Sequence, residues 1–168
     1  MGKEIINRVA NSSLITIDLT DYAADLQIFE IDLKQFLFEG FILKEKDFRT
    51  ALKEFDFSSY KNKVVAINCS RDCIIPMWAY MLVTSHLNNV ASEIHSGNKE
   101  TVFQKLFLQN IESISSAEFK NKKVIVKGCG HIPLTEALYV AITKKLQNTV
   151  SSLMFGEACS AVPVFKKK

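Results

Sequence analysis

YKNKVVAINC, residues 60–69, is an aliphatic segment that follows an aromatic-Lys-Asn-Lys lead and ends in a cysteine. FKNKKVIVKGC, residues 119–129, repeats this pattern with one extra residue before its cysteine. A short turn and a proline follow each copy, Pro76 or Pro133. Proline is well tolerated where a helix begins, because its missing N–H has no intrahelical partner there. Both copies therefore predict a strand, a turn and a helix in the same order.

The segments after these prolines extend the repeat. Both are typical of helices, and the strand-like segments 91–97 and 150–157 follow them. Each half is thus a strand–turn–helix–strand unit, covering residues 60–97 in the first copy and 119–157 in the second. Consecutive units of this kind give a parallel or mixed sheet with flanking helices.

Residues 1–59 are predicted to form strands and one helix ahead of the repeat. The alternating segments 14–19 and 26–33 fit half-buried strands. Residues 47–55 carry apolar side chains at helical spacing, which predicts an amphipathic helix with Asp47 as its cap.

The whole chain, residues 1–168, is expected to be one α/β domain. A chain of 168 residues can bury a genuine core, and no Ser-rich or low-complexity linker divides it. A helix over 98–111 joins the copies of the repeat, and residues 158–168 are interpreted as a C-terminal tail. We expect a single mixed or mostly parallel sheet with flanking helices, built partly from a duplicated strand–turn–helix–strand unit.

The composition excludes several classes of protein. The chain is 48% hydrophobic and 23% charged, which is typical of a globular protein. A net charge of +3 is too small to indicate a nucleic-acid partner, and the basic run 166–168 is typical of a solvated tail. The first residues lack the apolar core of a signal peptide, and no apolar stretch is long enough to span a bilayer. We expect a cytoplasmic protein that binds neither a membrane nor nucleic acid.

The four cysteines carry the main functional signal. Thiols stay reduced in the cytoplasm, so these residues are interpreted as packed side chains, metal ligands or reactive thiols and not as disulfides. The repeat places Cys69 and Cys129 alike, at the carboxyl end of a strand, where open α/β sheets bind ligands. A thiol beside a helix N-terminus has a lowered pKa, which favours the thiolate. Gly128 and Gly130 would let the backbone approach a cofactor held there.

If the two strands are neighbours, both thiols lie at the same end of one sheet, each within a turn of a helix start. Cys159, on a turn after the last predicted strand, and His131 then complete a Cys₃His set with Cys69 and Cys129. Such a set suits zinc or an iron–sulfur cluster. A second possibility is that the fourth ligand is Cys73 or Asp72 instead.

Buried, inert cysteines remain an alternative, because the spacings C-x₃-C and C-x-H match no strong metal signature. Two further functions are compatible with the sequence. A thiol-dependent enzyme would use Cys129 as its nucleophile, with His131 or His95 as the base. An interaction module would use the helix that contains Met77 to Val83, which is apolar on nearly all faces. Such a helix is buried in a core or at a subunit interface, which predicts a homodimer.

Nearly the whole chain contributes to a resemblance that rests on four segments: EIINRVANSSLITIDL, KEKDFRTALKEFDFSSYKNKVVAINCSRDCIIPMWAYM, VIVKGCG and SLMFGEACSAVPVF. Together these segments resemble the bacterial domain-of-unknown-function family numbered 2480. The resemblance implies a gene location near iron–sulfur assembly genes, and hence a cysteine-bearing accessory protein with assembly proteins as partners. It also implies that Cys69, Cys129 and Cys159 belong to the family pattern, whereas Cys73 often has a small residue in its place and His131 is particular to this chain. The resemblance therefore favours the three shared cysteines as ligands.

Overall fold

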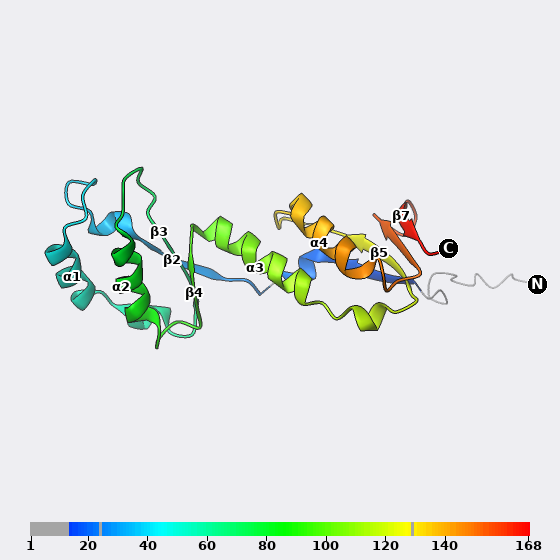
Figure 1. Cartoon of the computed structure of the whole chain (residues 1–168), viewed down its shortest axis with the longest axis horizontal. Helices are drawn as coiled ribbons and strands as arrows, with labels where there is room; N and C mark the ends of the chain where they lie inside the picture. The colour runs from blue at the N-terminus through cyan, green and yellow to red at the C-terminus, as the bar shows by residue number, and fades with distance from the viewer. Residues whose placement is uncertain (1–13, 24, 129) are drawn as a thin grey trace, which may run out of the picture. The chain divides into compact units, whose positions relative to one another are not determined.

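The computed structural model describes residues 14–23, 25–128 and 130–168 (Figure 1). The chain divides into two units: unit 1 contains Met1–Asp25 and Phe107–Lys168, and unit 2 contains Leu26–Leu106. Each unit is built on its own sheet. The predicted α/β class and the mostly parallel pairing of strands are confirmed, with two sheets where one was expected.

Unit 2 contains a three-stranded parallel sheet in the order β2-β3-β4. Its elements are β2 (Ile28–Asp32), η2 (Leu33–Phe36), α1 (Glu45–Glu54), η3 (Phe57–Tyr60), β3 (Val64–Asn68), α2 (Met77–Leu87) and β4 (Glu93–Ser96). The central strand β3 is buried through Val65, Ala66 and Ile67. This unbroken apolar run is typical of a parallel strand that is covered on both faces.

Aromatic packing joins α1 to α2, which lie side by side (Figure 1). The ring of Phe48 on α1 is fully buried and meets Phe36 and Trp78 edge-on, at centroid distances of 5.2 Å and 5.9 Å. The predicted amphipathic helix is therefore confirmed. The interpretation of Asp47 as its cap is wrong, because the helix begins at Glu45 with Lys44 as the N-cap residue. Asp47 lies in the first turn, where a carboxylate still interacts favourably with the helix dipole.

Unit 1 contains a four-stranded sheet in the order β1-β5-β6-β7. Its strands and short helices are β1 (Leu14–Asp18), η1 (Leu19–Tyr22), η4 (Ser116–Phe119), β5 (Lys123–Lys127), α4 (Glu136–Leu146), β6 (Ser152–Phe155) and β7 (Val162–Lys166). The boundary between the units falls within α3 (Lys99–Ser113). The sequence predicted that the helix after β5 begins at Pro133, whereas α4 begins at Glu136, with Thr135 as its N-cap residue.

β7 lies in the segment that was expected to be a tail. It pairs antiparallel with β6 and forms the edge of the sheet. Pro163 lies within this strand, and proline is tolerated mainly in edge strands because it has no backbone N–H to donate to a neighbouring strand. The edge position of β7 therefore makes Pro163 compatible with a strand.

The two copies of the aromatic-Lys-Asn-Lys lead have the same local structure. Asn62 and Asn121 adopt left-handed backbone conformations, with φ of 58° and 59°, which asparagine tolerates better than most residues. Asn62 N donates to Val90 O at 2.8 Å, and Asn121 N donates to Thr149 O at 2.9 Å. Each lead thus links the start of a strand to the end of the following helix. Duplication of the whole unit stays a prediction.

α2 is only partly buried, although it is apolar on nearly all faces. Ala79, Val83 and Leu87 are fully buried, whereas Met77 and Met81 are each 72% exposed. The helix was expected to be covered on most sides, but this chain covers only one of its faces. None of the helices in the described ranges combines the length and the apolar character needed to cross a membrane.

Candidate functional site

Two thiols lie together in the loop after β3. The Sγ atoms of Cys69 and Cys73 are 3.7 Å apart, and both side chains are partly exposed. A local turn produces this contact, because Cys73 N donates to Arg71 O at 3.0 Å and returns the chain toward the end of β3. Cys69 and Cys73 therefore form one dithiol, called the Cys69–Cys73 pair below.

Asp32, the last residue of β2, holds the start of this loop. Its Oδ1 atom accepts hydrogen bonds of 3.0 Å from both Lys34 N and Ser70 N. Partial burial acts to raise the pKa of Asp32, but the hydrogen bonds from Ser70 and Lys34 outweigh it and lower the pKa to about 2. The carboxylate therefore stays ionised and fixes the residue that directly follows Cys69. Asp32 also caps η2.

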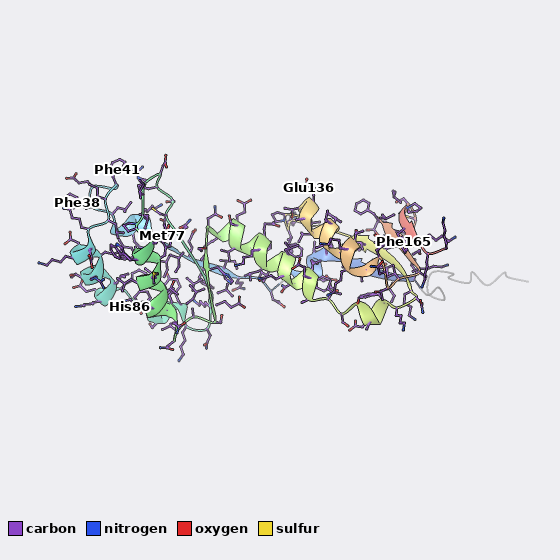
Figure 2. The ribbon with its side chains drawn as sticks, in the orientation of Figure 1. Phe38, Phe41, Met77, His86, Glu136 and Phe165 are labelled. Atoms are coloured by element: carbon purple, nitrogen blue, oxygen red, sulfur yellow. The ribbon has the colours of Figure 1, made fainter. Side chains whose placement is uncertain are left out.

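Exposed apolar side chains follow the pair along the chain. Ile74, directly after Cys73, is 93% exposed, and Met77 on α2 is also exposed. The Arg71 guanidinium lies over the ring of Phe41, 5.4 Å from its centroid, so the loop also contacts the turn 38–42. Figure 2 shows Phe41 and Met77 on these two segments. The pair is thus accessible from an apolar part of the surface.

The Cys73 thiol is shifted toward its protonated form. Burial and the hydrogen bond with Cys69 raise the pKa of Cys73, Asp72 adds to the rise, and Arg71 opposes it.

The remaining predicted ligands are distributed over both units. Cys159, in unit 1, is exposed on the turn after β6, and its Sγ lies 4.0 Å from Ser160 Oγ. His131, also in unit 1, and Asp72, in unit 2, are exposed. Cys129 lies outside the described residues. Within the described ranges, no three His, Cys, Asp or Glu side chains are arranged as a metal site.

The expectation that Cys69 and Cys129 follow neighbouring strands of one sheet is wrong. Cys69 follows β3 and residue 129 follows β5, and these strands belong to different sheets because each pairs within its own unit. Cys69 is also not within a turn of a helix start, since residues 70–76 separate it from α2. A metal shared by Cys69, Cys129 and Cys159 stays a prediction.

The two glycines of the 128–130 turn have local structural roles. A Cβ atom on Gly128 would overlap Leu134 Cδ1 and the Tyr139 hydroxyl oxygen, so a larger residue there would require these side chains to shift. Gly130 has a φ of 132°, a conformation that side-chain-bearing residues rarely adopt. The predicted approach of these glycines to a cofactor stays a prediction.

The predicted base His95 has its own partners in unit 2. Its Nε2 atom lies 2.9 Å from Glu93 Oε2, and Lys105 Nζ lies 3.4 Å from its Nδ1 atom. A thiol enzyme that uses Cys129 stays a prediction.

Sequence reasoning missed two polar residues that frame the pair. Asp32 was not among the predicted site residues, and its bond to Ser70 N joins residues 38 positions apart. Asn68, directly before Cys69, has a buried Oδ1 atom that accepts no hydrogen bond from the part of the chain that the structure describes. The C-x₃-C spacing was the one available signal for the pair, and it is weak without the turn at Arg71.

A family model described as "Protein of unknown function (DUF2480)" matches residues 3–167. The chain belongs to the DUF2480 family. The match covers essentially the whole chain and confirms the resemblance seen in the sequence. Comparison of this DUF2480 protein with curated proteins and with solved structures gave no significant match.

Asp32 makes stability depend on pH in acid. Because its folded pKa is about 2, below the ordinary 3.8, its contribution is fully present above about pH 4 and is lost as the pH falls through 2. We expect Asp32→Asn to remove this contribution, since the amide oxygen still accepts from Lys34 N and Ser70 N but does not titrate. Urea unfolding should give a difference of about 1–2 kcal/mol at pH 7 that disappears near pH 2.

Asp25→Asn is the matched control for this measurement, because Asp25 is exposed and forms no hydrogen bond or ion pair with the other described residues. Its free energy of unfolding should follow that of the parent protein at every pH. Parallel curves for Asp32→Asn and the parent protein between pH 7 and pH 2 would contradict the assignment.

Proposed function

We propose that this protein is a cytoplasmic accessory protein that holds a thiophilic metal ion or an iron–sulfur cluster through Cys69 and Cys73. The observation that carries the proposal is the 3.7 Å distance between their Sγ atoms. Two sulfurs at the corners of a zinc tetrahedron, each about 2.3 Å from the metal, are about 3.8 Å apart. The spacing of the pair therefore already matches that of two ligands to one metal.

The protonation state of Cys73 favours a ligand over a nucleophile. Burial and the hydrogen bond with Cys69 raise the pKa of Cys73, so this thiol is mainly protonated at neutral pH. A nucleophilic cysteine requires the thiolate, whereas a metal ion displaces the proton when it binds. Metal affinity should consequently increase with pH, because binding releases protons from the pair.

Two thiolates leave part of the coordination sphere to other donors. Soft thiolate ligands select zinc, copper(I) and iron–sulfur clusters over hard cations. In the proposal, the remaining ligands come from an iron–sulfur assembly partner. The exposed apolar side chains of Ile74 and Met77 beside the pair support a partner protein, since exposed apolar surface favours association.

Metal content of protein purified anaerobically without chelator tests this function. We expect Cys69→Ser and Cys73→Ser each to lose bound zinc or iron, because serine keeps the volume of cysteine but is a poor ligand for soft metals. Cys159→Ser is the control for thiol loss elsewhere and should keep the metal if the pair is the main site. Elemental analysis and thermal unfolding are measured on all four proteins.

Loss of metal in Cys159→Ser as well would favour the shared site predicted from the sequence. A parent protein without bound metal that also fails to bind added zinc or cobalt would contradict the proposal. So would full metal content in both Cys69→Ser and Cys73→Ser.

We also propose that the chain forms a homodimer through the exposed face of α2. Met77 and Met81 are each 72% exposed on an otherwise apolar helix, and methionine is common at adaptable interfaces. Light scattering should give twice the 19.0 kDa of one chain. We expect the double variant Met77→Lys, Met81→Lys to be monomeric, because two charges would be buried in the interface.

Val140→Lys is the control for this change, since Val140 is an exposed apolar residue on α4, and it should leave the mass unchanged. A parent protein with the mass of one chain at working concentration would rule out the dimer.

A further inference from the structure

The fold brings together two lysine runs that lie far apart in the sequence. One is the lead before β5, with Lys120, Lys122 and Lys123, and the other is the run 166–168. β6 lies between β5 and β7 in the sheet of unit 1. The register places Lys123 of β5 opposite Ser152 of β6, and Ser152 opposite Lys166 of β7. Both runs therefore lie at the same end of neighbouring strands in one sheet, which is called the lysine edge below.

Backbone hydrogen bonds fix this edge. Ser151 N donates to Lys122 O at 2.8 Å, and Lys167 N donates to Ser151 O at 2.9 Å. The Ser151 hydroxyl also donates to Lys122 O at 2.9 Å. The positions from which the lysine side chains extend are thus set by the sheet and not by a free tail.

The six lysines concentrate positive charge in this part of unit 1. All of them are exposed, and none forms an ion pair with another residue of the described ranges. One carboxylate, Glu118 on η4, lies close to the lead in sequence. Clustered like charges repel one another and raise the local concentration of anions. This edge therefore favours a multiply charged anion.

A pocket of about 510 Å³ opens at this edge. Its lining combines Lys123 of the first run and all three lysines of the run 166–168 with three apolar residues, Met154, Pro163 and Phe165. Ser152 also lines the pocket. Figure 2 shows Phe165 in this part of unit 1. Pockets of this volume are the size that small-molecule ligands occupy.

We propose that this pocket binds a phosphate-bearing small molecule with an aromatic body, of the nucleotide class. The lysines supply point charges for the phosphate groups, a role that lysine commonly has. The apolar lining, with the Phe165 ring, provides a surface against which an aromatic body packs or stacks. A free polyanion would use the lysines but not the apolar lining.

The corresponding edge of unit 2 does not have this combination. Its lead supplies Lys61 and Lys63, and Lys63 Nζ lies over the ring of Phe29, 4.0 Å from the centroid. The sheet of unit 2 ends at β4, so no described strand brings a second lysine run beside the first. The two leads are therefore a natural test and control pair within one chain.

Isothermal titration of the intact protein with ATP, AMP, adenosine and inorganic phosphate tests the proposal. We expect the nucleotides to bind more tightly than either adenosine or inorganic phosphate, with affinity that falls as salt is added. The double variant Lys123→Gln, Lys166→Gln should weaken nucleotide binding by about tenfold, through loss of two charge–phosphate interactions. The control double variant Lys61→Gln, Lys63→Gln should bind as the parent protein does.

Circular dichroism on each variant establishes that the fold is kept. The proposal is overturned if no nucleotide binds at millimolar concentration, or if inorganic phosphate binds as tightly as ATP. It is equally overturned if the control variant weakens binding as much as the test variant, which would indicate only diffuse positive charge. Tighter binding of a single-stranded oligonucleotide than of ATP would also overturn the proposal, because it would indicate that the ligand is a nucleic-acid strand. None of these results depends on Cys69 or Cys73.

Discussion

The carboxylate of Asp32 is the interaction on which the candidate site depends. It caps the N-terminus of η2 by accepting a hydrogen bond from Lys34 N, and it also accepts a 3.0 Å hydrogen bond from Ser70 N. The end of β2 thereby fixes the chain at the first residue after Cys69. The Cys73–Arg71 turn then needs to span only a short distance to return the second thiol to the first. Without the Asp32 anchor, a loop with exposed Arg71, Asp72 and Ile74 would have little to define its path.

The chemistry of the pair follows from that geometry. Sulfurs 3.7 Å apart share one environment, and their mutual hydrogen bond and partial burial raise the pKa of Cys73. These properties suit a ligand that exchanges its proton for a soft metal better than they suit a nucleophile. The lysine edge of unit 1 has a different basis, because strand register and not a loop brings its charged residues together. The chain thus carries two candidate sites that separate experiments can address.

Periodicity and turn chemistry predicted most of the fold, whereas the site depended on contacts that a sequence does not encode locally. The strands β3 and β5 were recognisable as unbroken apolar runs after the same lead. β7 was missed because residues 158–168 were interpreted as a C-terminal tail, and its edge position makes Pro163 compatible with a strand. Cys73 was ranked below Cys129 and Cys159, since the bonds from Ser70 to Asp32 and from Cys73 to Arg71 that place it cannot be seen in a C-x₃-C spacing. The single sheet was wrong because similar strands indicate a shared unit type and not a shared sheet.

A trivalent arsenical, which bridges two thiols only when they are close together, tests the Cys69–Cys73 pair most directly. The reduced, folded protein is treated with one equivalent and then digested with trypsin, which cleaves after Arg71 and so separates the two cysteines. Mass spectrometry should find the fragment that contains Cys69 joined through arsenic to the fragment that contains Cys73, and Cys73→Ser should abolish this product. An arsenic bridge from Cys69 to Cys129 or Cys159, or no bridge at all, would contradict the pairing of Cys69 with Cys73.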